Sequence, residues 1–438
     1  MQGLYLVSPL ILFLASYLGL CCIGGDFSHS SITLVAFLIA CIYAIAIAKG
    51  KLADRLTLFS QGAGHPTVLL MVWIYVLAGA FAYLAKQMGC IEATVDLTLH
   101  LLPATWILPG VFLASCFVSL AIGTSVGTII QLVPIAVGLS LSTDLSLPLM
   151  AAVVVGGAYF GDNLSFISDT TIAATQTQGC RMKDKFWTNL RLVLPVALVM
   201  MVIYYLIGRD AQVVREPQDI DFLLVVPYLV VVVASLCGLD VMLVLLLGIV
   251  LTGVIGMWRG TFDFFHWMDG LGTGMIGMGE LMLMAMLAAG LLELIRAAGG
   301  IDYLLRCISR GVKTRRSAEL SIAALVCVVN VCTANNTVAI LTSGPIVRRI
   351  AERYDISPRR SASILDTMSC FTQGLLPYGV QLLFAATLVS QQAGIPFSPV
   401  SIIPYLFYPM GMGLAVMVSI FWRRNQKKRM TNAIVKAS

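Results

Sequence analysis

Residues 148–178 read PLMAAVVVGGAYFGDNLSFISDTTIAATQTQ, an apolar run with a polar group near its middle. The run exceeds the roughly 20 residues that span a hydrocarbon core of about 30 Å. Gly161 and Asn163 are poor helix formers, and between them lies Asp162. An ionised carboxylate at membrane depth is costly and needs a partner. The stretch therefore predicts a membrane helix that breaks at a polar site.

The whole chain has the composition of a membrane protein. Of its 438 residues, 59% are hydrophobic and 11% are charged, against roughly a quarter charged in soluble domains. Ten apolar spans are predicted, at residues 4–23, 30–48, 66–88, 148–178, 188–207, 221–236, 240–258, 274–298, 358–392 and 399–422. The basic residues lie in short runs between these spans, as they do in cytoplasmic loops. The net charge of +6 is therefore not evidence for nucleic-acid binding.

The second half of the chain repeats the layout of the first. Adding 211 to the residue numbers brings the span 30–48 onto 240–258 and Gly79 onto Gly290. We expect both glycines to allow close helix packing. The predicted fold is an all-α polytopic membrane protein with two repeats and a basic tail. The corresponding segments are residues 1–211, 212–422 and 423–438.

The distribution of lysine and arginine predicts the orientation of the chain. If each span crosses the membrane, 23 of the 28 basic residues fall on one side, Lys185 among them. By the positive-inside rule, this side is cytoplasmic and holds both termini. Each half then contains five crossings, so the two halves enter the membrane from opposite faces. Inverted repeats of this kind are typical of secondary transporters, here expected in the plasma (inner) membrane.

Helix breaks are expected at matching positions of the two halves. They lie at Gly123–Thr128, Gly161–Ser165, Ala334–Thr337 and Thr372–Gly379. The first and third interrupt apolar stretches at residues 104–140 and 317–349, which we expect to form one re-entrant hairpin in each half. Unwound backbone at membrane depth is tolerated where it lines a cavity, and its carbonyls can bind a cation. We predict that polar groups at the midplane breaks coordinate the ion or substrate, namely Thr124, Ser125, Asn335, Asn336, Thr337 and Gln373.

Carboxylates inside the apolar spans are the predicted ligands for a cation or a proton. Asp162 and Asp169 lie seven residues apart, about two helical turns, and would share a face with Ser165 if the segment were helical. No basic residue is near Asp162 in the sequence, so Na⁺ or a proton is its expected companion. Competition between the two would produce antiport. The predicted cation and proton ligands are Asp162, Asn163, Ser165, Asp169 and Asp366, with Asp162 and Asp169 on Na⁺.

Residues 161–171, GDNLSFISDTT, resemble a motif of the NhaC-type sodium/proton antiporter family, Gly-Asp-Lys-x-Ser-Pro-x-Ser-Asp-Thr-Thr. The matching positions are Gly161, Asp162, Ser165, Ser168, Asp169, Thr170 and Thr171. The resemblance implies membership of the ion-transporter superfamily, with paired hairpins and broken helices around a midplane site. Two positions depart from the pattern, because Asn163 replaces its lysine and Phe166 replaces its proline. A lysine beside the carboxylate would be a resident cation able to carry the exchanged proton.

The leading hypothesis is a sodium/proton antiporter that works by alternating access, with no enzymatic activity. The alternative is a sodium- or proton-coupled carrier of a small organic acid or amino acid. No arginine or lysine lies near the breaks in sequence, which argues against a strongly anionic substrate. An intramembrane aspartyl protease using Asp162 and Asp366 is disfavoured because Gln373, the position matching Asp162, is not acidic. Inverted halves with broken helices favour alternating access over a passive channel.

Few other partners are expected. The eleven cysteines and four histidines show no metal-ligand spacing, so the sequence predicts no cofactor beyond the transported Na⁺ and H⁺. The expected partners are the ion or small-molecule substrate, the lipid bilayer and a second copy in a homodimer.

Overall fold

The computed structural model describes residues 2–24, 31–166, 168–214, 221–309 and 312–421. The elements within these ranges are helices, and the basic tail expected at 423–438 lies outside them. Nine helices are long and apolar enough to cross a membrane in the described chain, and ten if the bent pair Pro399–Tyr405 and Phe407–Phe421 forms one span. The predicted all-α polytopic membrane protein is confirmed.

The first half contains ten α-helices. These are α1 (Gln2–Gly24), α2 (Ser31–Ile47), α3 (Leu52–Ala63), α4 (Pro66–Met88), α5 (Cys90–Leu101), α6 (Ile107–Ile122), α7 (Ser125–Ser142), α8 (Leu147–Leu164), α9 (Asp169–Gln178) and α10 (Met182–Gly208). A short 3-10 helix, η1 (Ala104–Trp106), precedes α6.

The second half follows the same order. It contains α11 (Phe222–Leu236), α12 (Val241–Arg259), α13 (Phe264–Ile276), α14 (Gly279–Ala297), α15 (Gly300–Ser309), α16 (Arg315–Thr333), α17 (Asn336–Arg353), α18 (Pro358–Leu375), α19 (Val380–Ala393), α20 (Pro399–Ile402) and η2 (Ile403–Tyr405). The last helix of the described chain is Phe407–Phe421. The bounds of α8 and α18 differ by 211 residues at both ends, and the starts of α7 and α17 differ by the same number.

The two hairpin breaks lie where the sequence places them, and the other two begin later than expected, at equivalent positions of the two halves. The α6–α7 and α16–α17 hairpins turn at Gly123–Thr124 and Ala334–Asn335. The interval 376–379 separates α18 from α19. In the first half, α8 continues through the glycine and asparagine to Leu164, and α9 begins at Asp169. The backbone explains the shift, because the amide of Ser165 still donates to the Gly161 carbonyl at 2.7 Å.

Four helices occupy segments that were expected to be loops or parts of longer spans. They are α3, α5, α13 and α15. The span expected at 274–298 is wrong at its start, because α13 ends at Ile276 and α14 begins at Gly279. The helix α3 packs against α14, and α13 packs against α4. The helices α3 and α13 therefore each lie on a long helix of the other half.

Glycines allow these contacts, as predicted for Gly79 and Gly290. A Cβ atom at Gly79 would lie 2.3 Å from the carbonyl oxygen of Gly274 on α13. A Cβ atom at Gly290 would lie 2.4 Å from the ring of Phe59 on α3. Both distances are far below van der Waals contact, so only glycine fits at these crossings.

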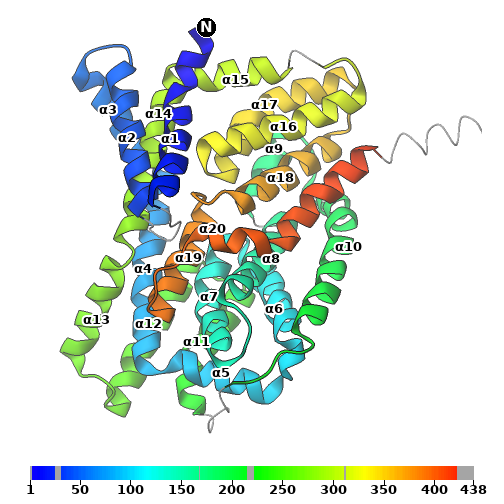
Figure 1. The fold of residues 1–438 in the computed structure, drawn as a ribbon. Helices are drawn as coiled ribbons and strands as arrows, with labels where there is room; N and C mark the ends of the chain where they lie inside the picture. Colours follow the sequence, from blue (N-terminus) through cyan, green and yellow to red (C-terminus); the bar gives the residue numbers. More distant parts are fainter. Residues whose placement is uncertain (1, 25–30, 167, 215–220, 310–311, 422–438) are drawn as a thin grey trace, which may run out of the picture.

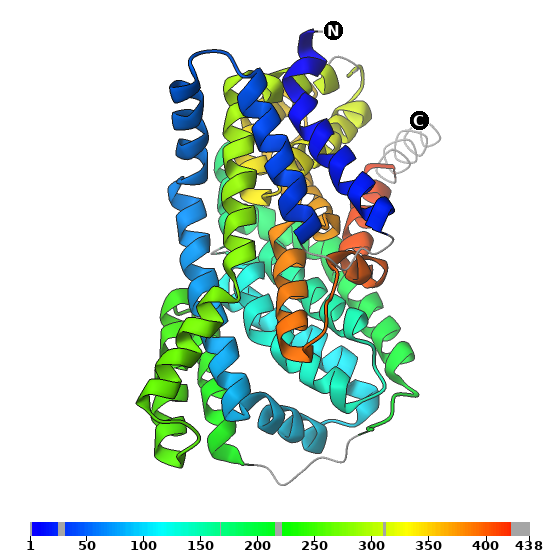
Figure 2. The same ribbon diagram turned by 60° about the vertical axis from the view of Figure 1, so that its left-hand side comes forward.

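The broken helix α8–α9 lies inside the molecule, whereas α10 lies at its edge. Nearly all residues of α8 are buried, whereas most residues of α10 are not. The hairpins α6–α7 and α16–α17 lie toward opposite ends of the molecule (Figure 1). The start of α1 and the end of the last helix lie toward the same end in both views (Figure 2). The breaks of α8–α9 and α18–α19 therefore lie between two oppositely placed hairpins.

Candidate functional site

Asp162 lies in the last turn of α8, and its side chain is buried, with 2% exposed. The Ser125 hydroxyl donates to Asp162 Oδ2 at 2.8 Å, and the Ser168 hydroxyl donates to Asp162 Oδ1 at 2.6 Å. Ser125 begins α7 directly after the hairpin turn, and Ser168 is the N-cap residue of α9. Serine hydroxyl groups from two different helix breaks therefore donate to the same carboxylate.

Buried amide side chains extend this network into the second half of the chain. Gln381 Nε2 donates to Ser125 Oγ at 3.1 Å, and Gln373 Nε2 donates to Gln381 Oε1 at 3.0 Å. Gln373 Nε2 also donates to the carbonyl oxygen of Ala334 at 2.9 Å. Because the glutamines flank the α18–α19 break and Ala334 lies at the α16–α17 break, the network connects Asp162 to both breaks of the second half.

The second buried carboxylate, Asp366 on α18, forms an ion pair with a lysine on α10. Lys185 Nζ lies 2.5 Å from Asp366 Oδ2, and both side chains are 0% exposed. The same ammonium group donates to the carbonyl oxygen of Asn163 at 2.5 Å and to Thr171 Oγ1 at 2.7 Å. Its three N–H donors are thus satisfied, which a buried ammonium requires to offset its desolvation.

Two asparagines also contact Asp366. Asn163 Nδ2 donates to Asp366 Oδ2 at 3.0 Å. Asn189 Nδ2 lies 3.0 Å from Asn163 Oδ1 and 3.3 Å from Asp366 Oδ2. Because Asn163 follows Asp162 directly in α8 and contacts Asp366, it links the two buried carboxylates.

The buried cluster contains two carboxylates and one ammonium group. Lys185 compensates Asp366, whereas the described residues offer Asp162 only hydroxyl donors. An unpaired carboxylate in a water-poor interior is costly unless a proton or a cation neutralises it. The cluster is therefore suited to one monovalent cation or one proton at a time.

Asp169 does not share a helix face with Asp162. The gap between α8 and α9 interrupts the helix on which the two carboxylates were expected to share a face, and Asp169 is exposed. The Thr337 hydroxyl donates to Asp169 Oδ2 at 2.6 Å. Asp169 and Thr337 therefore connect the start of α9 to the start of α17.

The asparagines at the α16–α17 turn mainly organise the backbone. Asn335 is the N-cap residue of α17, and its side chain accepts the amide of Val338 at 3.0 Å. Asn336 Oδ1 accepts the amide of Thr337 at 3.2 Å. These contacts are typical of helix starts.

Two residues near the α6–α7 turn also contact backbone groups. Thr124 is the N-cap residue of α7, and its carbonyl accepts the hydroxyl of Thr128 at 3.1 Å. The Ser165 hydroxyl donates to the carbonyl of Leu120 on α6 at 2.8 Å, which attaches the α8 end to the first hairpin.

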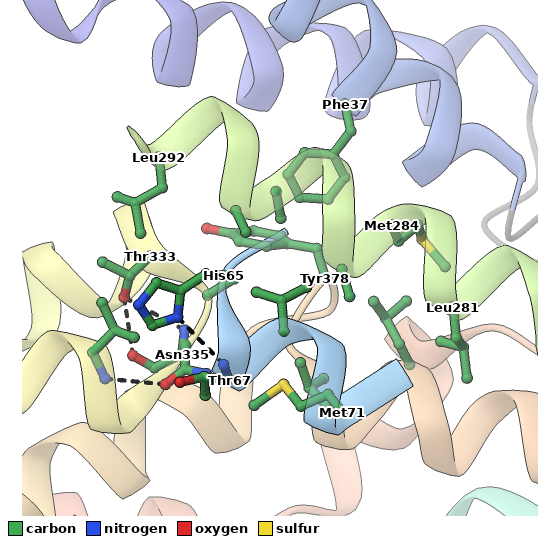
Figure 3. Close-up of a pocket in the computed structure, with 18 of the residues that line it drawn as sticks. Phe37, His65, Thr67, Met71, Leu281, Met284, Leu292, Thr333, Asn335 and Tyr378 are labelled. Carbon is green, nitrogen blue, oxygen red and sulfur yellow. Dashed lines mark hydrogen bonds between the residues drawn. The ribbon is translucent and has the colours of Figure 1, made fainter. Parts of the chain in front are cut away.

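A pocket adjoins the α16–α17 turn (Figure 3). Its walls are mainly apolar and include Phe37, Met71 and Met284, while Asn335 supplies polar atoms. Ala334 also lines the pocket, and its carbonyl is the one that accepts Gln373. The pocket wall is therefore joined to Asp162 through the buried glutamines.

Lys185 is the main residue that sequence reasoning misplaced. It was counted as a loop residue, and the expectation that no basic group lies near the breaks is wrong. The spacing of the sequence could have indicated its position, because Lys185, Asn189 and Val193 follow at intervals of four residues. In the structure all three side chains are buried. Spacing of this kind marks one face of a helix.

Comparison with known proteins gives matches along nearly the whole chain. Residues 4–209 and 220–422 match the model of the Na+/H+ antiporter family. The Na(+)/H(+) antiporter NhaC of Alkalihalophilus pseudofirmus is 24% identical over 72% of this chain and 76% of its own. The NhaC antiporter of Bacillus subtilis is 24% identical over 82% of this chain and 83% of its own.

A third relative is named for a different exchange. The malate-2H(+)/Na(+)-lactate antiporter of Bacillus subtilis is 21% identical over 81% of this chain and 81% of its own. The family model covers both halves of the chain, including the broken helices that hold the buried carboxylates. On this evidence the chain belongs to the Na+/H+ antiporter family.

Proposed function

We propose that this protein exchanges Na⁺ for H⁺ and that the two ions compete for the carboxylate of Asp162. The observation that carries the proposal is the charge of the buried cluster, in which Lys185 compensates Asp366 and leaves Asp162 without a cationic partner among the described residues. Either ion neutralises Asp162, but both cannot do so together. Competition for one carboxylate is sufficient to couple the two fluxes.

The oxygen atoms around Asp162 suit a small hard cation. The hydroxyl groups of Ser125 and Ser168 each donate a hydrogen bond to one of the two carboxylate oxygens. Thr170 Oγ1 lies 2.8 Å from Ser168 Oγ. When Na⁺ is bound, these hydroxyls would turn their lone pairs toward it. When Asp162 is protonated, the same oxygens can accept its hydrogen.

We further propose that residues 1–211 and 212–422 act as inverted repeats and that the site opens to each side of the membrane in turn. The equal offsets of α7 and α8 from α17 and α18, together with the exchanged packing of α3 and α13, support this proposal. The distribution of basic residues supports cytoplasmic termini by the positive-inside rule. We also propose that the protein lies in the plasma membrane. A homodimer and the absence of a cofactor stay predictions.

The test of the site is exchange by purified protein in vesicles that contain a pH-sensitive dye. With a proton gradient imposed, added Na⁺ should release protons through the wild type and not through Asp162→Asn, because an amide cannot be deprotonated. The matched control is Asp210→Asn, an exposed carboxylate whose side chain is 86% accessible, and it should exchange like the wild type. Wild-type exchange by Asp162→Asn would contradict the assignment.

A second candidate function is coupled transport of a small organic acid. The pocket beside the α16–α17 turn has apolar walls and polar atoms at Asn335, which suits a carboxylic acid with a short apolar body. The relative that exchanges malate and lactate favours the same reading. Adding lactate, malate or amino acids to the same vesicles distinguishes Na⁺/H⁺ exchange from coupled transport of an organic acid. Proton release that requires an organic acid, and not Na⁺ alone, would establish the carrier.

A further inference from the structure

A pocket outside the ion site lies where α10, α16, α18 and the last helix meet. Its volume of about 740 Å³ falls in the range of roughly 300–1,000 Å³ that is typical of small-ligand pockets. Its lining includes Thr188, Arg191, Ser357, Arg359, Ala415 and Val418. Both polar and apolar side chains therefore face this space.

Arginine dominates the charge of the pocket, and two of its arginines are already paired. Arg360 Nη2 lies 2.9 Å from Glu319 Oε2, and both side chains are nearly inaccessible. Arg315 lies 3.8 Å from Glu319 Oε1 and 3.9 Å from Asp355 Oδ2. The two nearby carboxylates thus account for two of the four arginines.

Arg191 and Arg359 supply the remaining positive charge. Both are exposed, and neither forms an ion pair within the part of the chain that the structure describes. Arg359 also lies in the first turn of α18, which begins at Pro358, so the positive end of the helix dipole adds to the charge there. An anion with several oxygen atoms would be favoured at this position.

The apolar surface beside the pocket is that of a membrane-facing helix. On α10, Trp187, Arg191, Leu194, Leu198 and Val202 follow at intervals of three or four residues, so they lie on one face. All five are exposed. Tryptophan is enriched at the headgroup level of bilayers, and leucine and valine suit the acyl-chain region. Arg191 therefore lies between an interfacial aromatic ring and a lipid-facing stripe.

We propose that this pocket binds the headgroup of an anionic phospholipid. The lipid phosphate accepts hydrogen bonds from the guanidinium groups of Arg191 and Arg359, and an acyl chain lies along the apolar face of α10. Arginine matches phosphate oxygens with two parallel donors. Basic pockets between membrane helices on the cytoplasmic side are suited to such headgroups. A free inorganic anion would use the arginines and leave the apolar stripe without a role.

A lipid in this pocket would contact the same two helices that form the ion site. The helix α10 carries Lys185, and α18 carries Asp366, so the two helices that line the pocket also form the buried ion pair. A bound headgroup would hold these helices together at their cytoplasmic ends. It should therefore raise the thermal stability of the purified protein.

The experiment measures binding of phosphatidylglycerol to the purified full-length protein in detergent, by native mass spectrometry and by thermal unfolding. Arg191→Gln with Arg359→Gln should bind phosphatidylglycerol about 30-fold more weakly, the loss expected for two basic groups near a lipid phosphate. The matched control is Arg349→Gln with Arg353→Gln, which removes the same charge from exposed positions on α17. The control should bind the lipid like the wild type.

Two further arms identify the ligand. Phosphatidylcholine should give little binding, and inorganic phosphate alone should not raise the unfolding temperature. Each of the single variants, Arg191→Gln and Arg359→Gln, should show part of the loss, which keeps the test valid if the double variant folds poorly. Equal lipid binding by the pocket and control variants, equal binding of the two lipids, or stabilisation by phosphate alone would overturn the proposal.

Discussion

Lys185 and Asp366 are both fully buried, so removing either one leaves an unpaired charge inside the protein. Breaking a buried ion pair from one side costs about 3–5 kcal/mol, because the remaining charge has lost its partner and has no access to water. We expect Lys185→Met to lower the free energy of unfolding by that amount. Adding Asp366→Asn should restore most of it, since both charges are then gone. Thermal unfolding in detergent measures both changes.

The same double variant tests which carboxylate exchanges ions. Lys185→Met with Asp366→Asn removes one positive and one negative charge, so the cluster keeps the single negative charge of Asp162. Na⁺/H⁺ exchange in vesicles should therefore persist in the double variant. Loss of exchange in a stable, folded double variant would show that the Lys185–Asp366 pair takes part in proton transfer.

At the scale of residues, the sequence revealed what lies within one segment. The interrupted apolar run identified Asp162 and Asn163, and the paired breaks identified Ser125 and Gln373. Lys185 was missed because it comes from a different helix, 22 residues from the carbonyl of Asn163 that it contacts. Its ammonium lies against the position where the NhaC-type motif has a lysine. The chain thus supplies from α10 a charge that its motif lacks.

At the scale of helices, composition predicted that breaks exist, but packing determined where one of them falls. The helix α8 continues past Gly161 because this glycine lies directly against α6. A Cβ atom there would lie 2.3 Å from Ser119 Cβ and 2.4 Å from the Leu120 amide nitrogen. Gly161 thus allows α8 to pack closely against α6, although composition alone predicted that the helix unwinds at this glycine. Single-sequence reasoning cannot distinguish these two uses of glycine.

This contact predicts the effect of one methyl group. Gly161→Ala should destabilise the protein by about 1–3 kcal/mol, because α6 and α8 must separate to admit the side chain. It should also impair exchange, since Asp162 is the next residue. The matched control is Gly272→Ala on α13, where no atom lies within 4 Å of the added Cβ. That change should be neutral or stabilise by roughly 0.5–1 kcal/mol, as alanine does in helices. Equal unfolding temperatures for the two variants would contradict the contact.

At the scale of the whole molecule, the hydropathy pattern captured the long helices and missed α3, α5, α13 and α15. These helices are short, so a search for apolar runs of membrane length does not detect them. Two of them contribute to the packing between the halves in a matching way, since α3 lies on α14 and α13 lies on α4. This exchange of partners is what two similar halves related by a two-fold axis would produce. Reporter fusions can test whether the two halves are inverted in the membrane.

If the halves are inverted, the connection between them and the C-terminus must lie on opposite sides of the membrane. Five predicted crossings precede the connection and ten precede the tail, so an odd number is expected between the two points. Reporter fusions after Val214 and after Ser438 test this arrangement. Alkaline phosphatase, which is active only outside the cytoplasm, should be active at the first junction and inactive at the second. A fluorescent protein that matures only in the cytoplasm should show the reverse. Cytoplasmic reporters at both junctions would mean that the second half crosses an even number of times, which would exclude inverted repeats and leave alternating access without its structural basis.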